Sequence, residues 1–268
     1  MSNWQPSGVI TITTDFGHKG PFAAVMKGVI LTRFPDASVI DLAHDIPAHW
    51  PPEAGFWIAR SYQYFPDGSI HVAIVDPGVG TEREIIIAEY DGHVFMAPDN
   101  GLLAPVLEKS DVVYQLVYDK LRSLGLSAPS PTFHGRDVFA PVAAEMAAGR
   151  IRPVEIGEMT AQWTPAWIDD PEVQSGRVSG VIITVDAFGN LISNIDATLI
   201  ESFSNPVAHL AGHDFVLKTT YGQARPGEYL ALINSFGVLE IARAEGSAAE
   251  GLGSERGAPI TVIEGAMI

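Results

Sequence analysis

The fold class follows from two consecutive segments, GVITITT at residues 8–14 and GPFAAVMKGVILTRF at residues 20–34. The first is short and rich in β-branched residues, which is typical of a buried strand. In the second, apolar side chains recur at helical spacing, and the segment stops at Pro35, so a helix is expected. A strand followed directly by a helix is the repeating unit of an α/β layer.

The same alternation continues through the first half of the chain. A proline pair opens a helix at Pro51, Asp91-Gly92 marks a hairpin, and Gly149 closes a helix as its C′ glycine. The predicted strands are 38–42, 69–75, 85–90, 93–95 and 112–118, and the predicted helices are 51–64, 101–108 and 137–148. We therefore expect an α/β domain with a largely parallel sheet.

The second half has a different pattern. Prolines and acids accumulate without periodicity around residues 163–176, as in a linker, and short strands with glycine-rich turns follow. These strands are 177–185, 191–195, 214–220, 229–233, 238–243 and 259–263, which is typical of a compact antiparallel barrel or sandwich. The predicted organisation is an α/β N-terminal domain at 1–165, a linker at 166–175 and a smaller all-β, barrel-like domain at 176–268.

Composition excludes several classes of function. The 268 residues include 16 Lys and Arg against 32 Asp and Glu, a formal net charge of −16, so nucleic acid and anionic membranes are not expected partners. The absence of cysteine excludes disulfides, thiolate nucleophiles and iron–sulfur clusters. There is no long apolar run and no signal-like N-terminus, which predicts a soluble cytoplasmic protein.

Polar turns at the predicted strand ends are the candidate functional sites. Asp15 follows the first strand and could bind sugar hydroxyls, or it could be a turn or N-cap acid. Asp76 could likewise be a simple turn acid, but Arg83, seven residues on, could return beside it as a fixed ion pair. His134 precedes a predicted helix, where backbone N–H groups face a ligand, although a surface histidine fits as well.

Two more polar turns lie in the second half. Asp186, Phe188 and Asn190 could bind an ammonium group, stack on a flat ring and hydrogen-bond a base edge, or could form an ordinary Asx turn. Residues 234–243 (NSFGVLEIAR) form a similar turn feeding a strand. Acids and histidines at strand ends also permit a metal hydrolase, but neither HExxH nor HxH spacing is present.

Seven motifs, in this order, carry a family resemblance: TTDFGHKGPF, DLAHDIPAHW, VDPGVGTER, APDNGLL, TFHGRDVFAP, VDAFGN and NSFGVLEIA. They resemble the S-adenosyl-L-methionine (SAM) hydroxide adenosyltransferases, relatives of fluorinase and chlorinase, over roughly residues 9 to 263. The resemblance implies hydrolysis of SAM to adenosine and L-methionine. It also implies an α/β domain and a β-barrel domain, assembled as a homotrimer with active sites at subunit interfaces.

The resemblance also implies roles for individual residues. Asp76, Arg83 and His134 match a catalytic triad that handles water. Asp15 matches the acid that holds the ribose hydroxyls. The other residues implied to bind substrate are Trp50, Phe133, Asp186, Phe188, Asn190, Ser235, Glu240 and Arg243, those from Asp186 onward being supplied by the neighbouring chain.

Halogenating relatives carry a tyrosine where Asp76 stands and a serine near Gly135, so water rather than halide is the expected nucleophile. The reaction would be in-line attack of an activated water on C5′, without a metal or other cofactor. A halide-using adenosyltransferase, a non-catalytic SAM or adenosine binder, and a metal-dependent hydrolase remain as alternatives.

Overall fold

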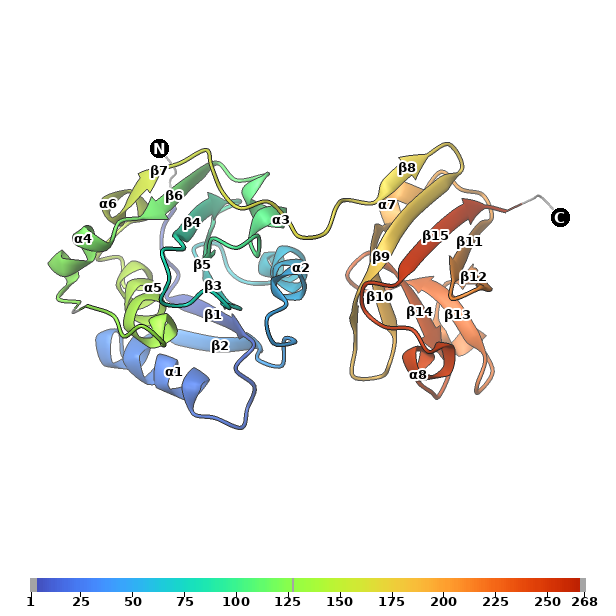
Figure 1. Ribbon diagram of the computed structural model, residues 1–268, viewed down its shortest axis with the longest axis horizontal. Coiled ribbons are helices and arrows are strands. Elements are labelled where there is room, and N and C mark those ends of the chain that lie inside the picture. The colour runs from blue at the N-terminus through green and yellow to red at the C-terminus, as the bar shows by residue number, and fades with distance from the viewer. Residues whose placement is uncertain (1–3, 127, 266–268) are drawn as a thin grey trace. The chain divides into compact units, whose positions relative to one another are not determined.

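The computed structural model describes residues 4–126 and 128–265, so the outer limits predicted for the two domains, residues 1 and 268, lie outside the described residues. The chain divides into two compact units, and the division falls between Trp167 and Ile168 (Figure 1). Among the described helices, none combines the length and the apolarity that a membrane span requires.

The first unit is built on one seven-stranded sheet with the order β2-β1-β3-β5-β4-β6-β7. Its strands are β1 (Val9–Thr14), β2 (Ser38–Ala43), β3 (Ile70–Ile74), β4 (Ile85–Tyr90), β5 (His93–Pro98), β6 (Val112–Leu116) and β7 (Gly157–Met159). Pairing is parallel from β2 through β1 and β3 to β5, and antiparallel from β5 through β4 and β6 to β7. The parallel half positions the candidate site, because its strands end at one edge.

Helices cover both faces of this sheet (Figure 1). Apolar side chains of α1 and α5 pack in one core with Ile10, Ile12 and Ile74, whereas α2 and α3 pack on the opposite face with Ala73 and Val75. The helices are α1 (Phe22–Arg33), α2 (Pro51–Ser61), α3 (Ala104–Leu107), α4 (Tyr118–Leu121), α5 (Ala140–Ala147) and α6 (Pro153–Ile156), with 3₁₀ turns at Tyr62–Tyr64 and Arg122–Leu124. The predicted α/β class is confirmed.

The helix predicted at 137–148 differs at its start. Residues Gly135–Phe139 form a π-helical turn in which the N–H of Ala140 bonds to the carbonyl of Gly135, and α5 follows. Pro141 has no N–H, so the α-helical bond to the carbonyl four residues earlier cannot form. At the other end Gly149 has φ +70°, as predicted for a C′ glycine.

The second unit is a closed β-barrel, which confirms the all-β prediction and decides between barrel and sandwich. Its strands are β8 (Glu172–Gln174), β9 (Arg177–Val185), β10 (Leu191–Asp196), β11 (Pro206–Leu210), β12 (His213–Lys218), β13 (Tyr229–Ile233), β14 (Val238–Arg243) and β15 (Pro259–Glu264). The order is β10-β14-β13-β12-β11-β15-β9-β8, and an additional β10–β9 pairing closes the ring. All neighbours are antiparallel except β12 and β13.

Two strands of this unit were not predicted. Strand β8 lies inside the predicted linker and pairs with β9, although all three of its residues are exposed, so no apolar pattern marks it. Strand β11 begins with Pro206 and buries only Ala208 and Leu210, too weak an alternation to stand out. Short helices α7 (Ala197–Ile200) and α8 (Ala248–Leu252) and a 3₁₀ turn at Tyr221–Gln223 connect the strands.

Candidate active site

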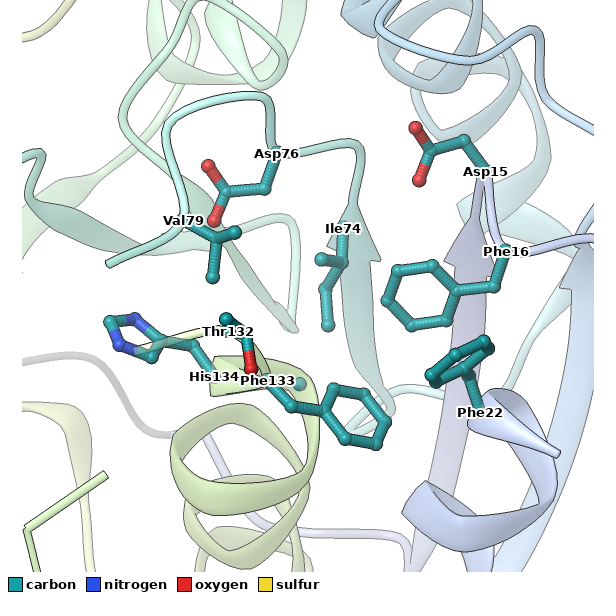
Figure 2. Close-up of a pocket in the computed structure, with 10 residues that line it drawn as sticks. Asp15, Phe16, Phe22, Ile74, Asp76, Val79, Thr132, Phe133 and His134 are labelled. Atoms are coloured by element: carbon teal, nitrogen blue, oxygen red, sulfur yellow. The ribbon is translucent and has the colours of Figure 1, made fainter. Parts of the chain in front are cut away.

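A cavity of about 220 Å³ opens at the carboxyl ends of β1 and β3. These strands are parallel neighbours with Thr14 opposite Ile74, so Asp15 and Asp76 follow at the same edge of the sheet (Figure 2). Ligands bind at this edge in α/β sheets. The lining residues are Asp15, Phe16, Phe22, Ile74, Asp76, Val79, Thr132, Phe133, His134 and Gly135.

Asp76, Arg83 and His134 form one hydrogen-bonded cluster beside this cavity. Arg83 Nε donates to Asp76 Oδ2 at 2.9 Å, and its Nη2 donates both to the same oxygen and to His134 Nδ1 at 3.0 Å. The side chains of Arg83 and Asp76 are only 9% and 4% exposed, so this ion pair is shielded from water. The Asp–Arg pair that the seven-residue spacing predicts is therefore present, and His134 joins it.

The loop between Asp76 and Arg83 owes its course to Gly80. This glycine has φ +78°, and a Cβ there would lie 2.1 Å from the carbonyl oxygen of Pro131. The loop therefore packs directly against the backbone that precedes His134, which only glycine allows. This close approach brings Arg83 within reach of His134, a residue 51 positions away.

The hydrogen bonds fix the state of the histidine ring. Burial lowers the pKa of His134, and the positive charge of Arg83 lowers it further, against the opposing effects of Asp76 and Asp137. Since a guanidinium can only donate, Nδ1 of the neutral ring is the acceptor and Nε2 carries the proton. His134 therefore holds Arg83 in place without adding a second positive charge.

The cluster keeps hydrogen-bonding capacity for a ligand. Asp76 Oδ1 and Arg83 Nη1 are both buried, and neither has a partner among the described residues. One is an acceptor and the other a donor, and a water molecule can serve both. Buried polar atoms of this kind are costly unless they serve a bound group.

Asp15 lines the cavity opposite this cluster (Figure 2). Its Oδ2 accepts a hydrogen bond from the backbone N–H of His49 at 3.2 Å. His49 has φ 61°, a left-handed conformation that is unusual for a residue other than glycine. The carboxylate is thus oriented at the strand end, where it can accept further hydrogen bonds from hydroxyl groups.

Three phenylalanines form the apolar wall of the cavity. The ring of Phe133 meets those of Phe16 and Phe22 edge-on at centroid distances of 6.0 and 5.5 Å. Phe133 was predicted here, whereas Phe16 and Phe22 were not. Their signal was available, since both lie within the motif TTDFGHKGPF that also contains Asp15.

Trp50 is placed differently from the other predicted residues of this unit. It precedes α2 and is not among the lining residues; its ring lies edge-on to Trp167 at 6.0 Å. The segment that carries it is nevertheless tied to the cavity, because His49 donates to Asp15.

In the second unit, Asp186 and Asn190 form a turn whose own N–H groups donate to the Asp186 carboxylate. Asp186 Oδ1 accepts from the backbone N–H groups of Phe188 and Asn190, both at 2.9 Å, and Oδ2 accepts from the Asn190 amide at 3.0 Å. This is the Asx turn that the sequence left open as an alternative. The turn displays the ring of Phe188, which is 79% exposed.

Glu240 is buried near this turn on strand β14. It accepts from the Tyr221 hydroxyl at 2.6 Å and from the Asn234 amide at 3.1 Å. Burial raises the pKa of Glu240, although both hydrogen bonds oppose the rise, and the charge of Asp186 adds to it. Tyr221 is the residue that sequence reasoning missed here.

The last two predicted residues differ in their surroundings. Ser235 is exposed in the turn before β14. Arg243 donates from Nε to the carbonyl of Gly227 at 3.2 Å, and its guanidinium lies 5.2 Å from the centroid of the Tyr229 ring. Within the described part of the chain, no group of three or more histidines and acids is arranged to hold a metal ion.

Comparison with known families gives matches to both units. The profile of the SAM hydroxide adenosyltransferase N-terminal domain matches residues 10–157, and that of the C-terminal domain matches residues 180–261. The chain belongs to the SAM hydroxide adenosyltransferase family.

Comparisons with individual proteins agree with that assignment. A protein from Thermus thermophilus named (R)-S-adenosyl-L-methionine hydrolase is 34% identical over 261 residues, which cover 93% of this chain and 97% of the relative. A fluorinase from an Actinoplanes species is 26% identical, covering 88% and 90%. The crystal structure of an uncharacterized conserved protein from Thermotoga maritima superimposes with a TM-score of 0.86 at 30% identity, covering 95% of this chain and 99% of that one.

Proposed function

We propose that this protein hydrolyses SAM to adenosine and L-methionine. The observation that carries the proposal is the buried Asp76–Arg83–His134 cluster beside the cavity. It contains one hydrogen-bond acceptor and one donor that have no partner among the described residues. The 34% identity to a relative named as a SAM hydrolase supports the choice of substrate.

The reaction needs little from the enzyme beyond an activated water. SAM carries a sulfonium, so when the water oxygen bonds to C5′, the C5′–S bond breaks and sulfur keeps the electron pair as a neutral thioether. The leaving group therefore needs no proton. Holding water and C5′ in line contributes as much as about 7–11 kcal/mol to lowering the barrier.

Each member of the cluster has a role in this step. Arg83 stabilises the negative charge that develops on the water, and Asp76 orients Arg83 and accepts a hydrogen bond from the water through Oδ1. His134 accepts from Arg83 and completes the alignment. As the water oxygen forms its bond to C5′, it loses one of its two protons, and this proton passes to solvent.

Substrate binding is divided between the two units. Asp15 would hold the ribose hydroxyls, Phe133 would pack against the nucleoside, and Trp50 would close the site from the adjoining segment. Asp186 would bind the methionine ammonium, with Phe188, Asn190 and Ser235 beside the substrate. The half-buried acid and exposed ring of the Asp186 turn support this assignment.

Glu240 and Arg243 have supporting roles in this proposal. Both oxygens of Glu240 are engaged by Tyr221 and Asn234, and Arg243 is held against Tyr229. Following the family resemblance, we propose a homotrimer in which the second unit of one chain completes the site on the first unit of the next. Cytoplasmic location stays a prediction from the sequence.

Water, not halide, is the proposed nucleophile. Asp76 stands where halogenating relatives have tyrosine, and a Cβ at Gly135 would lie 3.1 Å from Met26 Sδ and from Phe133. The serine that those relatives carry near this position is not present here. The test is product analysis in high chloride, where a halide-using enzyme would form chlorodeoxyadenosine.

The decisive experiment is incubation with SAM in ¹⁸O-labelled water. Adenosine carrying the label at its 5′-oxygen, together with methionine, is the expected result. Tight binding of SAM without any adenosine would show a binding protein instead and would contradict the proposal.

We propose further that no cofactor takes part in the reaction. Turnover is therefore expected to be unchanged in EDTA, and loss of turnover would favour a metal hydrolase.

A further inference from the structure

A buried threonine–histidine pair holds the turn that carries Asp15. Thr14, the last residue of β1, is fully buried, and its Oγ1 lies 2.8 Å from Nδ1 of His44, which is 2% exposed. His44 comes from the segment after β2 and is not part of the Asp76–Arg83–His134 cluster. None of the roles proposed above uses either residue.

The donor and acceptor in each hydrogen bond of His44 follow from its partners. Its Nε2 lies 2.8 Å from Asp41 Oδ1, and because a carboxylate only accepts, Nε2 carries the proton. In the neutral ring Nδ1 then accepts from the Thr14 hydroxyl. Thr14 Oγ1 in turn accepts from the backbone N–H of Phe16 at 3.2 Å.

His44 also holds the far end of the same turn. Its backbone carbonyl accepts from the N–H of Gly17 at 2.8 Å. The segment 14–17 is therefore tied to His44 on both sides of Asp15 and Phe16, which both line the cavity. These bonds restrain the backbone of the turn on both sides of the two cavity-lining residues.

The far side of the imidazole is anchored by a charge pair. Lys27 of α1 donates to Asp41 Oδ2 at 2.6 Å. Burial opposes ionisation of Asp41, but the hydrogen bonds from Lys27 and His44 outweigh it and lower its pKa. Asp41 therefore stays an anion that fixes the orientation of the His44 ring.

We propose that His44, through Thr14, is a positioning residue that aligns Asp15 and Phe16 for the nucleoside part of the substrate. The inference rests on the proposed function. It predicts that breaking the Thr14–His44 bond weakens nucleoside binding, whereas the chemical step, which depends on Arg83, is retained.

The same strand contains a matched control. Thr11, also fully buried on β1, places Oγ1 2.8 Å from Nδ1 of His71, which is 1% exposed and whose Nε2 lies 3.1 Å from His93. Thr11 and His71 are not lining residues of the cavity. Thr11→Val and Thr14→Val thus remove the same kind of buried bond, one in the core and one beneath the turn.

The experiment compares Thr14→Val, Thr14→Ser and Thr11→Val with the unchanged chain. Thr14→Val is expected to raise the KM for SAM and the adenosine Kd, measured by calorimetry, by about three- to tenfold, with kcat within about twofold. Thr14→Ser keeps the hydroxyl and should restore the affinity. Thr11→Val should lower the thermal midpoint of unfolding about as much as Thr14→Val does, but without changing the KM for SAM or the adenosine Kd.

The outcomes separate the two proposals. If the unchanged chain forms adenosine but Thr14→Val and Thr11→Val have the same KM and Kd, the positioning role is wrong. A Thr14→Val variant that loses kcat instead of affinity also contradicts it. If the unchanged chain forms no adenosine and binds none, the proposed function fails, and this inference with it.

Discussion

The two units present their carboxylates in opposite ways. In the first, Asp76 is almost fully buried and bonded to Arg83, and one of its oxygens has no partner among the described residues. In the second, Asp186 is half-buried, and both of its oxygens accept from its own turn. The buried acid belongs to a cluster that includes His134 from another loop, whereas the half-buried one depends only on its neighbours in sequence.

Under the proposed function, this difference suits the two acids to different tasks. A buried charge network with spare donors and acceptors can stabilise a developing charge, because its groups are already oriented and little water screens them. A self-contained turn at a surface offers charge and shape to a ligand but cannot drive a bond-breaking step. Changes in the Asp76–Arg83–His134 cluster should therefore lower kcat, and changes in the Asp186 turn should raise KM.

The largest effect is expected for Arg83→Ala. Removing the guanidinium leaves Asp76 as a buried, unpaired acid and takes away the donor to the water, so kcat should fall by about 10²–10⁴-fold. Steady-state kinetics with SAM measure this loss. Arg150→Ala, which breaks a guanidinium–carboxylate pair with Glu145 away from the cavity, is the control and should keep kcat. Unchanged turnover in Arg83→Ala would show that the cluster is not catalytic.

The pH dependence of kcat tests the state of His134. Burial and then Arg83 hold its pKa below the ordinary value, so the ring stays neutral as pH falls through about 6.5 and is protonated only in more acid solution. Between the lowered pKa of His134 in the folded chain and its ordinary pKa in the unfolded chain, the unfolded chain binds more protons. The free energy of unfolding therefore also falls as the pH is lowered through this range. We expect kcat to be level near neutrality and to fall only below about pH 6.5.

A pH–rate profile checks this expectation. In His134→Gln, whose side-chain carbonyl can still accept from Arg83, the acid limb should disappear. An acid limb centred above pH 7 in the unchanged chain would mean that the pKa of His134 is raised, contrary to this prediction.

Asp186→Asn should have a smaller effect, confined to binding. Asparagine keeps an acceptor for the backbone N–H groups of the turn but loses the charge that would attract the ammonium, so KM for SAM should rise about tenfold at similar kcat. Asp214→Asn, an exposed acid of the same unit paired with His209, serves as the control and should leave KM unchanged. Equal KM values for the two variants would remove Asp186 from the binding site.

The smallest effect is expected for Tyr221→Phe. Losing the hydroxyl removes one hydrogen bond to the buried Glu240, which should lower the free energy of unfolding by about 1 kcal/mol and change KM by less than about threefold. Denaturant unfolding together with kinetics measures both quantities. A large rise in KM would show that Tyr221 contacts the substrate directly and that the second unit takes a greater part than proposed.

Much of the fold could be predicted from local patterns. The strand at 8–14 and the helix after it, the C′ glycine Gly149 and the all-β second half follow from periodicity and turn chemistry, which depend on neighbouring residues. Strand β8 could not be predicted, because its three exposed residues acquire their structure only by pairing with β9.

The sequence by itself determined which chemical groups stand at the strand ends: Asp15, Asp76, the Asp–Arg spacing and the Asp186 turn. Only the tertiary structure decided which of them meet. Arg83 reaches His134 because Gly80 lets two loops come into contact, Thr14 reaches His44 across 30 residues, and the barrel closes where β10 pairs with β9. Such contacts depend on the paths of distant segments and on the space between them, and no local pattern of residues encodes either.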